Sequence, residues 1–195
     1  LRPSPAGQPT LRLFWLLKND IGLDQSLFPN HPDRFAFVDK YCEILPGAFI
    51  ITDIPKNHPT PKGNRHLPLR QDRRWLPDPF DHELILVIQE AAGLVVFTGC
   101  SHHGILNMLD AVTAHFPAQT ILALFGGFHL LDNPLYNSLA GSPAEIENLG
   151  RQLLQYPIQA IYTGHCTVMK AYPILQRPLG DKLHYFATGD RVEIN

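Results

Sequence analysis

Apolar and polar residues alternate most regularly in the second part of the chain. Residues 84–88 and 94–98 are apolar runs joined by a short segment that ends in a glycine, which is the pattern of a β-hairpin. Apolar residues then recur at helical spacing over 105–116, which predicts a helix with Ser101 as its candidate N-cap. Residues 121–125 form another apolar run, which predicts a buried strand.

The pattern after this strand continues to alternate between helix and strand. Ser142, Pro143 and Glu145 predict a helix start, because serine caps, proline fits the first turn and glutamate closes the capping box. A strand, a short helix and a final pair of strands are then predicted at 158–163, 169–175, 184–187 and 191–194. This order indicates an α/β (α+β) fold with a mixed sheet that helices cover on one face. The opposite face must also be buried, because the runs at 94–97 and 121–125 are apolar on both sides.

The first part of the chain, up to about residue 80, contains most of the 18 prolines. Proline fixes φ and lacks an N–H donor, so this part is predicted to be irregular with few strands. Its best strand candidate is the apolar stretch at 49–54. Residues 1–30 are ambiguous, because 11–17 fits either a helical turn or a strand.

Composition narrows the classes of function. The chain has 195 residues, of which 45% are hydrophobic and 17% charged, which fits one soluble globular domain over 1–195. A net charge of −2 without a lysine or arginine stripe argues against nucleic acid as a partner. No apolar run reaches the ~18 residues that a bilayer span needs, so no membrane partner is expected. The 3 cysteines are an odd number without a disulfide pattern, which favours the cytoplasm.

Three apolar runs end in the same way, with a glycine and then, within three residues, a histidine. These histidines are His102, His129 and His165. Chemistry in layered α/β proteins lies just beyond the carboxyl ends of strands, so the three side chains can converge at one sheet edge. Catalytic zinc sites commonly use three protein ligands and a water. The pattern therefore predicts a metal site; the alternative is that each histidine is an ordinary polar residue at a strand end.

Several neighbours of these histidines leave alternatives open. His103 follows His102 directly and is expected to point elsewhere, into helix packing or solvent. Cys100 and Cys166 are interpreted as small buried residues, with a thiol nucleophile paired with a histidine as the alternative. Asp81 begins an Asp-His-Glu segment before a predicted strand and is the candidate catalytic carboxylate near the site. A solvated turn is the alternative for that segment.

Three segments resemble consecutive signatures of one protein family. They are Cys-Ser-His-His-Gly-Ile at 100–105, Gly-Gly-Phe-His-Leu at 126–130 and Gly-His-Cys-Thr at 164–167. In this order they resemble the metallo-β-lactamase-fold metallohydrolases, in the branch of the dihydropterin-(ribofuranosyl)aminobenzene 5′-phosphate synthases. The segments at 51–56 and 81–84 are similar to further stretches of that family, so the likeness runs over about residues 45–195.

This resemblance implies a metallo-β-lactamase-like αββα sandwich with a metal centre at the edge of its two sheets. It implies that His102 and His165 are metal ligands, and that His129 is a third ligand or a proton-donating catalytic neighbour. The implied cofactor is zinc, as one or two divalent ions, with manganese or iron as alternatives. The implied reaction is hydrolysis of a small phosphorylated or ester substrate, pterin-related in this branch, through a metal-bound hydroxide.

The chain departs from the family pattern in one serious respect. The principal metal motif of the family, His-x-His-x-Asp-His, does not occur in this sequence. Together with Leu1 in place of Met, this favours the C-terminal portion of a longer enzyme whose N-terminal part is missing. The alternative is a catalytically silent binding or regulatory domain that has lost the metal. If one sheet lacks partner strands, its exposed edges also favour a homodimer or aggregation.

Overall fold

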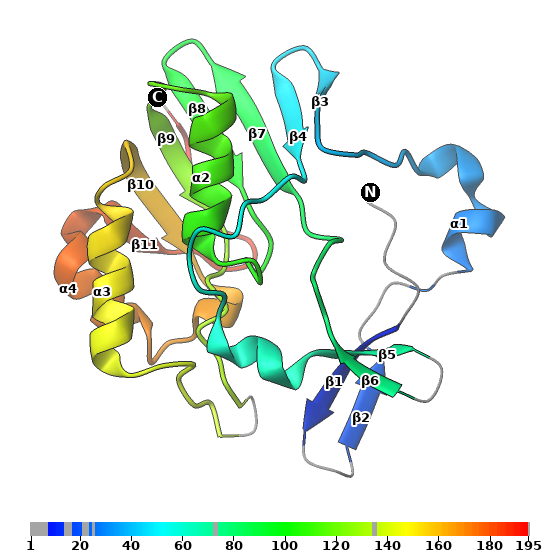
Figure 1. Ribbon diagram of the computed structural model, residues 1–195. Coiled ribbons are helices and arrows are strands. Elements are labelled where there is room, and N and C mark those ends of the chain that lie inside the picture. Colours follow the sequence, from blue (N-terminus) through cyan, green and yellow to red (C-terminus); the bar gives the residue numbers. More distant parts are fainter. Residues whose placement is uncertain are drawn as a thin grey trace.

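A seven-stranded mixed sheet forms the centre of the molecule (Figure 1). The computed structural model describes residues 8–13, 17–20, 24, 26–71, 74–133 and 136–194, the first two ranges by their backbone alone. From edge to edge the strands are β11 (Leu183–Tyr185), β10 (Ile158–Thr163), β9 (Ile121–Phe125), β8 (Gly93–Phe97), β7 (Ile85–Glu90), β4 (Ala48–Ile51) and β3 (Tyr41–Leu45). Strands β8 to β11 run parallel, whereas β3, β4, β7 and β8 pair antiparallel. The predicted mixed sheet is confirmed.

Three helices pack against one face of this sheet: α2 (Ile105–His115), α3 (Pro143–Leu153) and α4 (Tyr172–Leu179). They share one hydrophobic core with the strands, in which Leu109 and Val96 are fully buried. In Figure 1, α2 lies over β8 and β9, as expected for a sheet covered by helices. None of the helices in the described part of the chain has the length and hydrophobicity of a bilayer-spanning helix.

The predicted start is confirmed for α3 and wrong for α2. Ser142 Oγ accepts a hydrogen bond from the Glu145 N–H, and the Glu145 carboxylate accepts one from the Ser142 N–H. The cap of α2 is Gly104, with a φ of 91° that favours glycine. Ser101 has a left-handed φ of 60°, and its hydroxyl lies 3.0 Å from that of Thr98. Ser101 therefore belongs to the tight turn that precedes the helix.

The first part of the chain contains more strands than its prolines predicted. Four short strands form a second sheet, in the order β2 (Leu17–Asp20), β1 (Gln8–Leu13), β5 (Pro68–Gln71) and β6 (Arg74–Pro77). Pro68 and Pro77 pair with each other at the outer ends of β5 and β6, where a missing N–H is tolerated. The ambiguity at 11–17 is resolved in favour of strands, with 14–16 outside the described residues. Helix α1 (Leu27–Asn30) follows β2, and the strand expected at 49–54 is β4.

The C-terminal elements correct two predictions. The short helix expected at 169–175 is α4, which begins at Tyr172 with Pro173 in its first turn. Only the first strand of the expected final pair forms, as β11, and it pairs parallel with β10. The second strand is replaced by a turn, in which the Asp190 carboxylate accepts a hydrogen bond from the Ala187 N–H.

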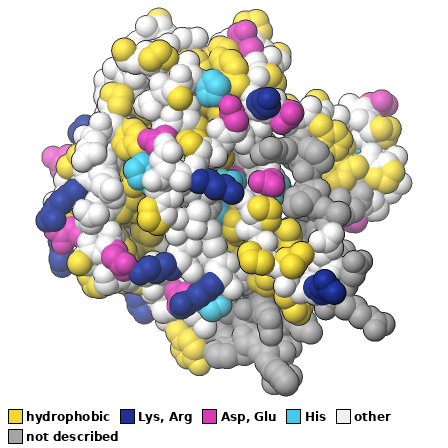
Figure 2. Space-filling view, in the orientation of Figure 1, with side chains coloured by type: hydrophobic (Ala, Val, Ile, Leu, Met, Phe, Trp, Pro, Cys, Tyr) yellow, Lys and Arg dark blue, Asp and Glu magenta, His cyan; other side chains and the backbone are white. Residues whose placement is uncertain are grey.

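The face of the large sheet opposite the helices carries a row of stacked rings. Phe97, Phe125, Tyr162 and His184 lie on or beside neighbouring strands, with centroids 5.0, 4.6 and 4.9 Å apart in that order. Phe97 is 36% exposed, so the prediction that this face is buried holds only in part. On the molecular face drawn in Figure 2, lysine and arginine side chains are interspersed with acidic ones, in keeping with the small net charge.

Candidate metal centre

The turns that follow β8, β9 and β10 carry the three candidate histidines to one edge of the sheet. Because these strands are parallel neighbours, their carboxyl ends meet there. The rings of His102 and His129 lie with their centroids 4.2 Å apart. His165 opens the 3-10 helix η3 (His165–Thr167) and lies beside Cys100 and Cys166. The turns therefore converge as the sequence predicted, while a single ligand set of His102, His129 and His165 stays a prediction.

Backbone strain is concentrated in these turns. His129 and His165 have left-handed φ values of 45° and 46°, and Ser101 has 60°. Such a conformation costs an L-residue about 1–2 kcal/mol and often marks a functional site. The glycines before the histidines are needed because neighbouring atoms leave no room for a side chain. A Cβ on Gly127 would collide with Cys166 Sγ, and one on Gly164 with the Phe186 carbonyl.

Asn64 fixes the orientation of His102. The Asn64 amide nitrogen donates to the His102 carbonyl at 2.8 Å, which leaves its oxygen to accept from His102 Nδ1 at 3.0 Å. This pairing assigns a proton to Nδ1, so Nε2 is the nitrogen left for the hydrogen bond to Cys100 and, when deprotonated, for a metal ion. Phe80 stacks on the same ring, with centroids 4.3 Å apart and planes 7° from parallel. Asn64 lies in the short 3-10 helix η2 (Lys62–His66), so this helix is what positions the ring.

Glu83 is the carboxylate that holds the histidine turn. It accepts hydrogen bonds from the backbone N–H groups of His102 and His103, at 2.7 and 2.8 Å. A third contact, of 2.9 Å, joins it to His103 Nδ1, so His103 points to Glu83. Burial raises the pKa of Glu83, but the His103 hydrogen bond, the charge of His102 and the two N–H donors together hold it below its usual value. The role predicted for Asp81 stays a prediction, since the contact from its segment comes from Glu83.

His129 is a buried imidazole without a hydrogen-bond partner. It is 8% exposed, and neither ring nitrogen has a partner among the described residues. Burial, with the neighbouring His102, lowers the pKa of His129 to about 4, so the ring is neutral near pH 7. An unsatisfied buried polar atom costs about 1–3 kcal/mol. A neutral imidazole with a free lone pair is also the form that binds a metal ion, so these residues fit the implied metal.

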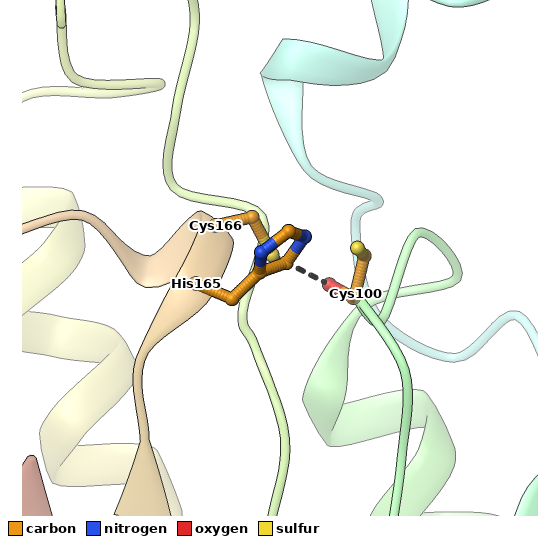
Figure 3. A group of neighbouring side chains, drawn as sticks. All are labelled: Cys100, His165 and Cys166. Carbon is orange, nitrogen blue, oxygen red and sulfur yellow. Dashed lines mark hydrogen bonds between the residues drawn. The ribbon is translucent and has the colours of Figure 1, made fainter. Parts of the chain in front are cut away.

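Cys100 and Cys166 also lie at the site, in a position that the sequence did not predict (Figure 3). The sulfurs of Cys100 and Cys166 and a ring nitrogen of His165 all lie within 4.8 Å of one another. Hydrogen bonds from the Cys166 thiol and from His102 lower the pKa of Cys100 to about 4, whereas the Cys100 thiolate and burial raise that of Cys166. The prediction assumed that adjacent residues on an extended chain face opposite sides. The chain is left-handed at His165, so both His165 and Cys166 turn toward Cys100.

A cavity of about 430 Å³ opens beside His102. It lies between the histidine turn and the segment that carries β6, and its lining includes Lys56, Arg65, Trp75 and Phe80. Arg65 also forms a 2.6 Å ion pair with Asp132. The cavity thus combines two cations with two aromatic walls, next to the ring that Asn64 orients.

Comparison with known proteins gives two relatives. No family model matches the chain. It is 29% identical over 131 residues to the 7,8-dihydropterin-6-methyl-4-(beta-D-ribofuranosyl)-aminobenzene-5′-phosphate synthase of Methanocaldococcus jannaschii, covering 66% of this chain and 42% of that protein. The crystal structure of Tm1679, described as a metal-dependent hydrolase of the beta-lactamase superfamily, superposes with a TM-score of 0.69 and 29% identity. That match covers 82% of this chain and 58% of Tm1679, so the chain spans about half the length of either relative.

Proposed function

We propose that this chain, which belongs to the metallo-β-lactamase superfamily, supplies part of the metal centre of a hydrolase acting on a small phosphorylated or ester substrate. The observation that carries the proposal is the pair of His102 and His129. Asn64 orients one ring through its Nδ1, and the other ring is buried, neutral and without a hydrogen-bond partner among the described residues. The two ring centroids lie 4.2 Å apart. His165 is the third proposed ligand. Zinc suits these imidazoles best, with manganese or iron as alternatives.

The residues of this chain divide the work of such a site. Glu83 holds the backbone of the histidine turn, and Asn64 sets the tautomer of His102. His129 is a proposed ligand or proton-donating neighbour; burial, with His102 beside it, lowers its pKa to about 4, which favours the neutral ring that binds a metal. A divalent ion bound here would activate a water molecule and polarise a substrate oxygen. Asp81 is retained as the proposed carboxylate beside the reacting groups.

The cavity beside His102 supports an anionic substrate. Lys56 and Arg65 line it together with Asp78. Because Arg65 is paired with Asp132, Lys56 is the cation proposed to pair with a phosphate or carboxylate group. Trp75 and Phe80 offer flat apolar walls that fit a planar ring. A pterin-related phosphate ester combines these features, as the printed name of the archaeal relative suggests.

A silent binding domain is the second candidate. The observation that favours it is the lack of a His-x-His-x-Asp-His motif in this sequence, which leaves few ligands for an ion. Such a domain would bind the anionic ligand in the same cavity without retaining a metal.

Metal analysis of the purified chain separates the two candidates. Zinc content is measured after dialysis for the chain and for the variants His102→Ala and His165→Ala, with His31→Ala as the control, since His31 is exposed and far along the chain from the site. Hydrolysis of p-nitrophenyl phosphate and p-nitrophenyl acetate is followed in parallel. We expect zinc binding, weakened at least about tenfold by either site variant and unchanged by the control. A chain that binds no zinc, or site variants that bind it as the control does, would remove the hydrolase proposal in favour of the silent domain.

A further inference from the structure

The cluster of Cys100, Cys166 and His165 is a donor set in its own right. Its three ligand atoms lie within 4.8 Å of one another, and they come from the turns after β8 and β10 (Figure 3). A tetrahedral ion about 2.3 Å from two sulfurs needs those sulfurs about 3.8 Å apart. The cluster therefore needs to contract by about 1 Å at most to close around one ion.

The surroundings of Cys166 are built to hold its sulfur in place. The His129 backbone N–H donates to Cys166 Sγ at 3.3 Å, and hydrogen bonds of this kind stabilise metal-bound sulfur. Gly127 leaves room for the sulfur, since a Cβ at that position would collide with it. Cys166 itself is 7% exposed, so its sulfur is shielded from solvent and from competing thiols.

The fourth coordination position is open to solvent. A shallow hollow of about 360 Å³ is lined by Cys100 and His165 together with Gly99, Gly126 and Gly164. The glycines add no side chain to the hollow, whose remaining walls are Thr98, Tyr162 and Phe186. A site with three protein ligands and one open position is the arrangement of catalytic rather than structural zinc.

We propose that Cys100, Cys166 and His165 form a thiolate metal site that binds one zinc-type ion and leaves its fourth position to water. The Cys166 thiol, which donates to the Cys100 carbonyl at 3.6 Å, and the Cys100 thiol coordinate as thiolates, so binding releases their protons to solvent. Two sulfurs and one imidazole are a soft donor set, which selects zinc over magnesium or manganese. This site goes beyond the proposed function. Because the one lone pair of an imidazole binds one ion, His165 serves here in place of its role beside His102 and His129, and the two thiolates make zinc the expected metal.

Cobalt is the probe that tests this site. The whole chain is reduced, stripped with a chelator and titrated anaerobically with Co²⁺. We expect a near-ultraviolet thiolate-to-cobalt charge-transfer band that saturates at one equivalent. Its intensity should fall to about half in Cys100→Ser and in Cys166→Ser and should stay unchanged in Cys42→Ser, which alters the third cysteine, in β3. Because Cys166 is buried, Cys100→Ser at its half-buried position is the variant that keeps the test valid if Cys166→Ser does not fold.

Three outcomes overturn the proposal. Cobalt binding without a charge-transfer band would place the ion on histidines alone, and a band that survives both cysteine variants would place it elsewhere. A disulfide between Cys100 and Cys166 that persists in the reduced, metal-free chain, seen by mass spectrometry, would make the pair structural. Failure of the thiolate site can be told apart from failure of the proposed function. A chain without the thiolate band can still bind zinc that His102→Ala abolishes, and that result would leave the proposed function standing.

Discussion

Replacement of Glu83 by alanine is the sharpest test of how the histidine turn is held. The carboxylate accepts from the N–H groups of His102 and His103 and pairs with His103 Nδ1. The His102 N–H is near the surface and can turn to water, but both His103 donors are buried, since this residue is 6% exposed. At about 1–3 kcal/mol for each of these two buried donors, we expect Glu83→Ala to lower the free energy of unfolding by about 2–6 kcal/mol.

The assay is urea unfolding of the metal-free chain, followed by circular dichroism at pH 7. Glu90→Ala is the matched control, because Glu90 is exposed and ends β7, the strand that begins two residues after Glu83; its effect should stay within about 0.5 kcal/mol. A loss below about 0.5 kcal/mol for Glu83→Ala would refute the reasoning, because it would mean that water replaces the carboxylate at no cost.

The pH dependence gives a second view of the same residue. The pKa of folded Glu83 lies below its ordinary value of 4.5, so the ionised carboxylate stabilises the fold above that pH, and this stability is lost as the pH falls through the folded value. Glu83→Gln removes the titrating group while keeping its size. We expect the difference in unfolding free energy between the parent chain and Glu83→Gln to shrink on acidification below about pH 4.5. A difference that stays constant with pH would contradict an ionised Glu83.

Three other perturbations test the remaining contacts. Asn64→Ala should weaken zinc binding about 10–100-fold in isothermal titration, since His102 loses the partner that fixes its tautomer; an unchanged affinity would mean that the ring is oriented by packing alone. Gly127→Ala should destabilise the chain by about 1–3 kcal/mol in thermal unfolding, because its Cβ collides with the buried thiol beside it. Gly99→Ala is the control, with nothing within 4 Å of the added Cβ, and equal effects of the two would disprove the close approach. The folded pKa of His129 is about 4 against an ordinary 6.5, so the unfolded chain binds more protons between these values. The metal-free chain should therefore lose about 3 kcal/mol of stability between pH 6.5 and 4, and His129→Leu, measured in the same urea series, should lose much less.

The elements that the sequence predicted well are those whose side-chain pattern has one simple period. The helix expected at 105–116 and the strands at 121–125 and 158–163 all formed, because their apolar positions repeat over several turns or pleats. Strands β5 and β6 were missed, since proline is read as a strand breaker, although it is tolerated at the ends of both strands. The end of the chain was misread because a turn held by Asp190 follows β11.

The candidate site, like the fold, was predicted only in part from the sequence. Convergence of the three histidine turns follows from the parallel order of β8, β9 and β10, which the sequence pattern indicated. The sequence pattern does not predict which neighbours of each histidine also lie in the site, because their direction depends on the backbone angles of single residues. The segment that contains Glu83 was considered for a carboxylate, but Asp81 was selected from it. The place of Glu83 directly before the predicted strand at 84–88 was the signal that could have distinguished the two.

The left-handed turns explain why the donors gather where alternation would separate them. On an extended chain His165 and Cys166 would face opposite sides, but a φ of 46° at His165 turns both toward Cys100. Glycine would adopt this angle without the penalty of about 1–2 kcal/mol that an L-residue carries. His129 bears the same penalty at 45° and in addition leaves both ring nitrogens unpaired. Two imidazoles at positions where glycine is the stable choice are unfavourable in the metal-free fold, and binding of the proposed ion to their nitrogens would offset this cost.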